Sequence, residues 1–323
     1  MAGLPFPMLA SYWIPYVGIG KPIQKVVVPL TDILKYRLKD GTPQTKIVFL
    51  GFGNFACSAQ NFAPPYVTVD PGVVQQLTLQ PGQTKTAVQQ LQAAGIKVLL
   101  SIAGNGQLQM GWGAIPYGSG SARYANMLAF AQWVQTNLID AYGLDGIDID
   151  DEWAPSDPQT FMDTVGILRN VMSGTLLTKA LWNDSGQFST PVSAGAPYNS
   201  GAMLSSLLDL GCTMTYGSDF NGQVGAINMY KSWGMTAGRL CVGVQAGPSE
   251  LGWMTDINET AKLAQWAVTP QAGAPPALGI MLYTFPQDIE QWDHYPQNSP
   301  GYMFPNPNDH AWQRAIVKGM WGQ

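Results

Sequence analysis

Residues 144–153 read Leu-Asp-Gly-Ile-Asp-Ile-Asp-Asp-Glu-Trp, with acidic side chains at the alternating positions 148, 150 and 152 and one more at 151. Successive side chains of a β-strand point to opposite faces, so Asp148, Asp150 and Glu152 share one face. The two isoleucines and Asp151 occupy the other face. Carboxyl groups about 7 Å apart along a strand repel one another, and like charges raise at least one pKa. A carboxylic acid that stays protonated near neutral pH can serve as a general acid. The pattern therefore favours a catalytic row of acids.

A calcium-binding or solvated loop is the alternative for an Asp-x-Asp-x-Asp pattern. Calcium loops need glycine and polar residues between the ligands so that the chain can wrap around the ion. Here the interleaved residues are isoleucines, which favour extended backbone. A strand is the better interpretation.

Composition restricts the classes of protein and partner. The 323 residues suit a single α/β barrel. Only 11% of the residues are charged and the net charge is −5, which is typical of a neutral, carbohydrate-handling surface. The sequence has no run of Lys and Arg, so we expect no nucleic-acid partner. No apolar run approaches the roughly 20 residues that span a membrane, so we expect no membrane partner. We expect a monomer.

Cysteine and histidine are scarce. The three cysteines Cys57, Cys212 and Cys241 are expected to be buried free thiols. The two histidines, His294 and His310, are expected on the surface or in packing. So few cysteine and histidine side chains make a zinc site or a Ser-His-Asp triad improbable. We therefore predict neither a metal nor a cofactor.

The cellular location stays open. The N-terminal residues Met-Ala-Gly-Leu-Pro-Phe-Pro show no basic region followed by an apolar run and a cleavage site. We expect a protein that is used inside the cell, or one that is secreted if a signal was removed.

Strand-like and helical patterns alternate along the whole chain. The apolar runs that predict strands are 8–16, 45–53, 97–103, 144–150, 191–197, 212–216, 239–245 and 279–284. The patterns that predict helices are 84–94, 121–141, 157–172, 200–210, 222–233, 257–267 and 309–320, with a short candidate at 31–37.

Eight such units predict an α/β fold, a (β/α)₈ TIM barrel. A doubly wound sheet is the alternative, but no Gly-x-Gly-x-x-Gly follows the first strand. We predict one domain over residues 1–323, with no insertion domain between strands seven and eight. The stretch 54–83 is predicted to be an irregular loop at the catalytic face. Acids at the C-terminal end of a barrel strand lie at the catalytic mouth, with Glu152 at the rim.

The motif resembles the Asp-Gly-x-Asp-x-Asp-x-Glu signature of glycoside hydrolase family 18, which comprises chitinases and endo-β-N-acetylglucosaminidases on a (β/α)₈ barrel. Ser101-Ile-Ala-Gly104 resembles the Ser-x-Gly-Gly of strand three, with Ala103 in place of the first glycine. Residues 193–197 resemble the strand-five segment, and Met214-Thr-Tyr216 resembles the Met-x-Tyr of strand six. Tyr283 stands where strand eight ends.

The resemblance implies substrate-assisted catalysis with retained configuration. Glu152 is then the acid and base, and Asp150 orients the acetamido group and stabilises the developing charge. Asp148 shares a proton with Asp150, and Tyr216 bonds the acetamido oxygen. The expected partner is a glycan or chitin oligosaccharide that contains N-acetylglucosamine.

Two departures from the chitinase pattern favour one substrate class. Gly217 follows Tyr216 where chitinases have Asp, and Tyr283 replaces their strand-eight Trp. With no insertion before strand eight, the chain looks more like the endo-β-N-acetylglucosaminidases that cut the chitobiose core of N-glycans. A chitinase is the alternative. A non-catalytic carbohydrate-binding protein is less favoured because the terminal glutamate is retained. A barrel enzyme of unrelated chemistry lacks a phosphate loop or metal cluster to support it.

Further residues are candidates for sugar contacts. Aromatic rings stack on pyranose faces, yet an aromatic ring in a barrel is more often core. Polar candidates lie just after strands, where a loop-capping role is the alternative. The predicted substrate-binding residues are Trp13, Asn105, Trp153, Asp219, Gln245 and Tyr283, and Trp112 and Tyr117 are further aromatic candidates.

Overall fold

Parallel strands close into a barrel at the centre of the computed structural model, which describes residues 4–17, 24–25, 28–116, 124–152, 157–246, 254–289 and 310–323. Within these ranges eight strands run parallel around the barrel, and pairing of the first with the second closes it. In barrel order they are β1 (Met8–Trp13), β4 (Thr45–Phe55), β6 (Lys97–Ala103), β7 (Gly146–Asp150), β8 (Leu176–Leu181), β9 (Leu210–Thr213), β10 (Leu240–Gln245) and β11 (Gly279–Tyr283). The predicted (β/α)₈ barrel is confirmed.

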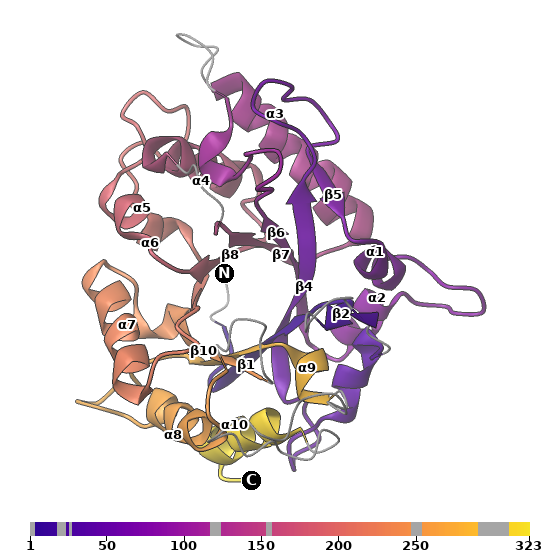
Figure 1. The fold of residues 1–323 in the computed structure, drawn as a ribbon, viewed down its shortest axis with the longest axis vertical. Coiled ribbons are helices and arrows are strands. Elements are labelled where there is room, and N and C mark those ends of the chain that lie inside the picture. The colour runs from indigo at the N-terminus through magenta and orange to yellow at the C-terminus, as the bar shows by residue number, and fades with distance from the viewer. Residues whose placement is uncertain are drawn as a thin grey trace.

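Helices surround the barrel, and those from α3 to α8 follow one another around it in chain order, whereas α10 packs beside α8 (Figure 1). They are the 3₁₀ turn η1 (Leu30–Lys35), α1 (Pro71–Leu77), α2 (Ala87–Ala93), the 3₁₀ turn η2 (Trp112–Ala114), α3 (Ala125–Val134), which continues as the π-helical η4 (Gln135–Asp140), α4 (Pro158–Val171), α5 (Ser185–Ser189), α6 (Leu204–Leu207), α7 (Phe220–Ser232), the 3₁₀ turn η5 (Ala237–Arg239), α8 (Ile257–Val268), α9 (Phe285–Ile289) and α10 (Ala311–Trp321). Helix starts carry side-chain caps, as at Asp157 and Asp256, which satisfy the first free N–H groups.

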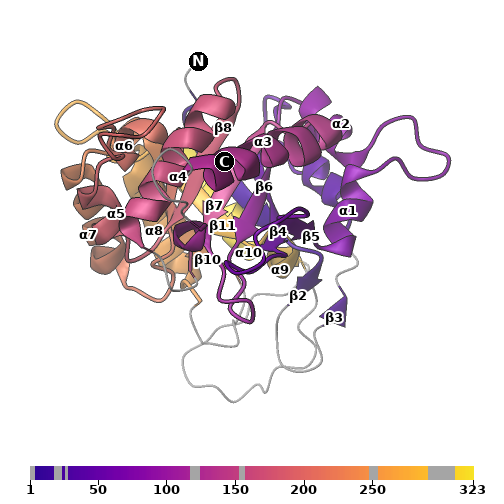
Figure 2. The same cartoon turned by 90° about the horizontal axis from the view of Figure 1, so that it is seen from above.

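Smaller strands lie outside the barrel. β5 (Val67–Val69) pairs antiparallel with the end of β4, and β2 (Tyr16–Val17) pairs with β3 (Gln24–Lys25). Figure 2 shows β2 and β3 beyond one end of the barrel. The stretch 54–83 was predicted to be irregular, and that prediction is wrong in part, because it contains β5 and α1.

Alternation along the strands divides the core into two layers. In β1, Met8, Ala10 and Tyr12 belong to the cluster inside the barrel, whereas Leu9 and Trp13 belong to the cluster between barrel and helices. Successive strand residues point to opposite faces, so each strand contributes to both layers. The interior is therefore filled with side chains.

The fifth barrel strand is not where the sequence predicted it. Residues 191–197 form no strand; Ser193 instead donates its backbone N–H and its hydroxyl to the two carboxylate oxygens of Asp163 on α4. The observed strand is β8, Leu-Leu-Thr-Lys-Ala-Leu. Its buried Lys179 interrupts the apolar pattern, and this is why the strand was missed. The other predicted strands coincide with observed ones to within a few residues.

The remaining expectations on the fold have mixed outcomes. The three cysteines are buried and free, as predicted. His310 packs edge-on against the ring of Tyr36, with ring centres 4.3 Å apart, and His294 lies outside the described residues. Between β10 and β11 the described residues hold α8 and no further domain. The single domain over 1–323 stays a prediction. None of the described helices is both long and apolar enough to cross a membrane.

Glycine is required on β10 where the strands approach closely. A Cβ at Gly243 lies 1.8 Å from the backbone oxygen of Thr213, so we expect Gly243→Ala to cost about 1–3 kcal/mol, as overpacking does. Gly225, exposed in α7, has nothing within 4 Å of such a Cβ, so Gly225→Ala is expected to stabilise by about 0.5–1 kcal/mol. Urea unfolding of the two variants measures whether each change lowers or raises the free energy of unfolding. A stable Gly243→Ala variant contradicts the packing argument.

Candidate active site

The acids of β7 divide between two faces as the alternation predicted. Asp148 and Asp150 are 1% and 5% exposed, whereas Ile147 and Ile149 pack in the layer between barrel and helices. Glu152 follows the strand by two residues and is exposed to solvent. The row thus runs from the barrel interior to its surface.

Asp148 is held by three hydroxyl groups from three different strands. Tyr12 and Ser101 donate to Oδ2 at 2.5 and 2.8 Å, and Thr178 donates to Oδ1 at 2.6 Å. These hydrogen bonds favour the ionised form. Burial nevertheless outweighs them and raises the pKa of Asp148 above its usual value.

Asp150 lies between two other carboxyl groups. Burial, the charges of Glu152 and Asp148, and a side-chain hydrogen bond with Glu152 raise the pKa of Asp150 well above its usual value. The charge of Glu152 thus acts on Asp150, and a shared face for these two side chains stays a prediction.

One oxygen of Asp150 is left without a partner. Its Oδ1 is buried and accepts no hydrogen bond from the described residues. Leaving a buried acceptor unsatisfied costs about 1–3 kcal/mol, and such costs concentrate at functional sites. This oxygen is available to an N–H or O–H donor of a ligand.

Three tyrosines gather around the acids. Tyr216 and Tyr283 stack with ring centres 5.7 Å apart, and Tyr283 meets Tyr12 edge-on at 5.4 Å. Burial first, and then the charges of Tyr283, Glu152 and Asp150, raise the pKa of Tyr216 well above its usual value. Tyr216 therefore keeps its proton and can donate a hydrogen bond.

This arrangement supplies the parts of acid–base chemistry. The exposed carboxyl group of Glu152 acts through its charge on the buried Asp150, whose Oδ1 has no partner among the described residues, and both charges act on the hydroxyl group of Tyr216. Titratable groups whose environments differ this strongly mark acid and base roles.

The predicted aromatic contacts are wrong for two tryptophans. Trp13 is 3% exposed, packs outside the barrel and donates its indole N–H to the backbone oxygen of Val28. Trp112 is buried against Phe55 and donates to the backbone oxygen of Ile102. Neither ring is accessible to a sugar. Trp153 and Tyr117 lie outside the described residues.

The three predicted polar residues lie at the mouth of the barrel, but two of them form hydrogen bonds with neighbouring backbone groups. Asn105 accepts from the backbone N–H groups of Gln107 and Leu108, which is loop capping. Asp219 is exposed and caps α7 through Gly222. Gln245 is buried beside Tyr283 on the neighbouring strand. Sugar contacts by these residues stay predictions.

Sequence reasoning missed several groups that support the acids. Ser101 was quoted in a motif without a role. Tyr12 shares its face with Met8 and Ala10, an alternation that could have indicated a position inside the barrel. Thr178 was hidden because its strand was misplaced.

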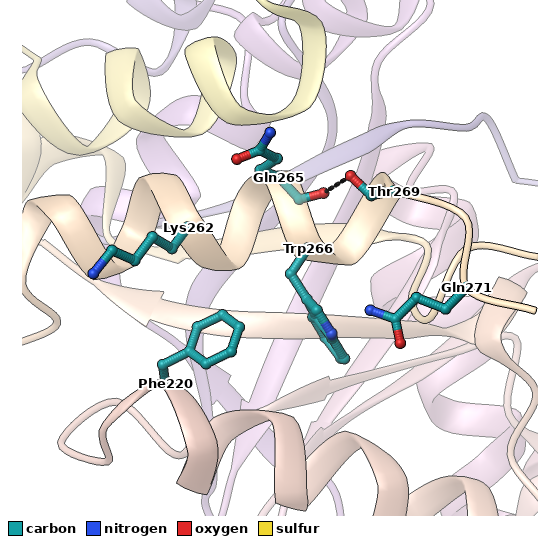
Figure 3. Close-up of a pocket in the computed structure, with 6 residues that line it drawn as sticks. All are labelled: Phe220, Lys262, Gln265, Trp266, Thr269 and Gln271. Carbon is teal, nitrogen blue, oxygen red and sulfur yellow. Dashed lines mark hydrogen bonds between the residues drawn. The ribbon is translucent and has the colours of Figure 1, made fainter.

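A surface cleft lies elsewhere on the molecule. It has a volume of about 420 Å³ and is lined by Phe220, Lys262, Gln265, Trp266, Thr269 and Gln271, on α7, α8 and the segment after α8 (Figure 3). None of these residues belongs to the predicted site. In the ranges that the structure covers, no group of three or more His, Cys, Asp or Glu side chains is arranged to hold a metal ion.

Comparison with solved structures identifies the fold class. A candidate chitinase A from Streptomyces coelicolor matches with a TM-score of 0.64 and 16% identity, covering 98% of this chain and 99% of that one. A chitinase from Bacteroides thetaiotaomicron gives 0.62 and 11%, covering 98% and 97%. A fungal endo-β-N-acetylglucosaminidase from glycosyl hydrolase family 18 gives 0.54 and 14%, covering 96% and 97%.

The chain therefore has the fold found in chitinases and endo-β-N-acetylglucosaminidases of glycoside hydrolase family 18 over nearly its whole length. No protein-family model matches the sequence, and no curated protein matches it.

Neutralising Asp150 should stabilise the protein. Because burial raises the pKa of Asp150 in the folded state, the ionised carboxylate destabilises the fold at neutral pH, and this penalty disappears as pH falls below the unfolded-state pKa. We expect the free energy of unfolding of Asp150→Asn at pH 7 to exceed that of the wild type by about 0.5–2 kcal/mol. Thermal unfolding across a pH series measures the difference, which should narrow toward acidic pH. A gain that does not depend on pH contradicts the assignment.

Proposed function

We propose that this protein is a glycoside hydrolase that cleaves the β-1,4 bond after an N-acetylglucosamine residue. The observation that carries the proposal is the buried Asp150, whose pKa is raised by burial and by the charge of the exposed Glu152, and whose Oδ1 has no hydrogen-bond partner among the described residues. A sugar that carries a 2-acetamido group offers the N–H donor that this oxygen lacks. The partner is a glycan or chitin oligosaccharide, and the catalytic unit is the single barrel of residues 1–323.

The first chemical step uses the substrate as its own nucleophile. Glu152 gives its proton to the glycosidic oxygen, and the bond from that oxygen to the anomeric carbon breaks. The acetamido carbonyl oxygen forms the new bond to the anomeric carbon, giving an oxazolinium ion. Asp150 accepts the acetamido N–H and stabilises the positive charge, while Tyr216 donates to the carbonyl oxygen and orients it.

The second step returns the enzyme to its starting state. The carboxylate of Glu152 takes a proton from water, whose oxygen attacks the anomeric carbon from the side the leaving group occupied. The oxazolinium ring opens and the configuration is retained. Asp148, held by Tyr12, Ser101 and Thr178, adds negative charge behind Asp150 and favours a proton on one member of the pair.

The favoured substrate is the chitobiose core of N-glycans. Gly217 after Tyr216 and Tyr283 at the end of β11 depart from the chitinase pattern in the direction of endo-β-N-acetylglucosaminidases. Chitin and its oligosaccharides are the alternative, and structures of both kinds of enzyme are similar to this chain. A non-catalytic binding protein is less favoured because Glu152 is present and exposed.

Replacing the acid should abolish turnover without harming the fold. We expect Glu152→Gln to lose roughly 10²–10⁴-fold in kcat, because glutamine cannot deliver a proton and general acid–base catalysis contributes that much. Release of sugar from an N-acetylglucosamine tetrasaccharide measures the loss, with circular dichroism as the check on folding. The matched control Glu259→Gln on α8 should retain full activity. Wild-type turnover in Glu152→Gln excludes this residue as the acid.

Digestion of two substrates side by side separates the two candidate activities. A high-mannose glycoprotein and a chitin oligosaccharide are each incubated with the enzyme and read by mass spectrometry. We expect the glycoprotein to lose its glycan and keep one N-acetylglucosamine on asparagine. Cleavage of the oligosaccharide alone identifies a chitinase, and binding without cleavage of either favours the non-catalytic protein.

A further inference from the structure

A buried cation lies behind the acid row and has no part in the chemistry described so far. Lys179 on β8 is 1% exposed. Its Nζ donates to Asp184 Oδ1 at 2.7 Å and to the backbone oxygen of Ala180 at 2.9 Å, and it lies 5.8 Å from the centre of the Phe161 ring. Asp184 also accepts the hydroxyl of Tyr230 on α7 at 2.9 Å.

Stability alone does not account for this ion pair. Taking two charges out of water carries a large desolvation cost, and apolar side chains of similar volume often serve a fold equally well or better. The neighbours Leu177 and Leu181 show that this face of β8 otherwise carries apolar residues. A role other than packing is therefore expected for Lys179.

The position of Lys179 relates it to the acids. Lys179 stands opposite Ile149 in the pairing of β8 with β7, so it lies next to the strand residue between Asp148 and Asp150. Its charge lowers the pKa of both aspartates and so opposes the effect of burial. In turn, the charges of Asp184, Asp151 and Asp150 favour the protonated lysine, and the pKa of Lys179 is raised although burial lowers it.

The same cluster also holds the backbone between the two acids. Asp184 directly precedes α5, and Gln187 of that helix donates its Nε2 to Asp151 Oδ2 at 2.7 Å. Asp151 stands between Asp150 and Glu152 in the chain. The ion pair with Lys179 fixes the start of α5, and α5 then holds the segment from which Glu152 projects.

We propose, on the basis of the function proposed above, that Lys179 is a positioning residue that aligns Asp150 and Glu152 through Asp184, Gln187 and Asp151 and balances the negative charge of the row. The titratable groups that face it are Asp184, Asp151 and Tyr230, with Asp148 and Asp150 on the adjoining strand. A purely structural ion pair is the competing explanation.

The test compares charge removal at two Lys–Asp pairs, the buried pair Lys179–Asp184 and the more exposed pair Lys97–Asp145. Lys179→Met removes the buried cation, and Lys179→Met with Asp184→Asn removes both charges while keeping an acceptor for Tyr230, which protects folding if the single variant is unstable. Lys97→Met is the matched control, because Lys97 pairs with Asp145 at 2.7 Å just before β7 begins, at the opposite end of that strand. Lys179→Arg keeps the charge and serves as the rescue variant.

With a chitin tetrasaccharide as substrate, Lys179→Met should lower kcat and not raise KM. We expect a loss on the order of tenfold to a hundredfold from misalignment of the acid, with KM nearly unchanged. Without the cation, Asp148 and Asp150 bind protons more tightly, so the acidic limb of the pH–kcat profile moves to higher pH. Lys97→Met should leave kcat and the acidic limb of the pH–kcat profile unchanged. Lys179→Arg should retain the wild-type position of that limb.

Carboxyl ¹³C NMR with labelled aspartate gives a readout that does not need activity. The resonance that Asp150→Asn removes should titrate at higher pH in Lys179→Met than in the wild type. If the wild type cleaves no N-acetylglucosamine substrate, the proposed function fails, and the position of this resonance still decides the role of Lys179. Folded variants that keep the wild-type profile and titration, or that lose activity without either shift, overturn the inference.

Discussion

Burial of negative charge along β7 is the constraint on which the site depends. Two carboxyl groups lie within the barrel, nearly inaccessible to water, and a third stands at its surface. Desolvation is the largest cause of the raised pKa at both buried aspartates. The surroundings compensate only in part: Asp148 receives three hydroxyl donors, whereas one oxygen of Asp150 has no partner among the residues that the structure describes. The two buried aspartates therefore differ in their hydrogen bonds: those of Asp148 are satisfied, and those of Asp150 are not.

The two-layer core of the barrel produces this difference between the surroundings of Asp148 and Asp150. Each strand sends alternate residues inward and outward, so Tyr12, Ser101 and Thr178 reach Asp148 from three separate strands. The same alternation on β8 sends Lys179 outward, behind the acids. The hydroxyl groups and the cation thus act on the row from opposite sides of the barrel wall. Placing them requires closure of the whole sheet, which the pairing of β1 with β4 provides.

The sequence predicted what local alternation determines. The faces of Asp148 and Asp150 followed from the spacing of residues 144–153, and β6 was predicted with the bounds observed. Trp13 was wrongly expected to meet a sugar because the strand was recognised without deciding which of Tyr12 and Trp13 faces inward, and a shift of one residue exchanges the faces.

Contacts between distant parts of the chain lay beyond such reasoning. β8 was missed because a lysine in a buried strand contradicts the apolar pattern, and its partner Asp184 becomes visible only when the turn after β8 folds back. The hydroxyl groups on Asp148 come from positions 12, 101 and 178, whose proximity no local pattern contains. The free oxygen of Asp150 likewise follows from the whole environment of the site.

In the proposed mechanism the substrate's acetamido group, held by Asp150, takes the place of an enzyme nucleophile. Removing that group tests the claim most directly: the rate of cleavage of an N-acetylglucosamine tetrasaccharide is compared with that of the same oligosaccharide after deacetylation. We expect cleavage of the acetylated compound alone, with the β-anomer of the product formed first. Equal rates for both compounds would contradict it, because Asp150 would then act without the acetamido group.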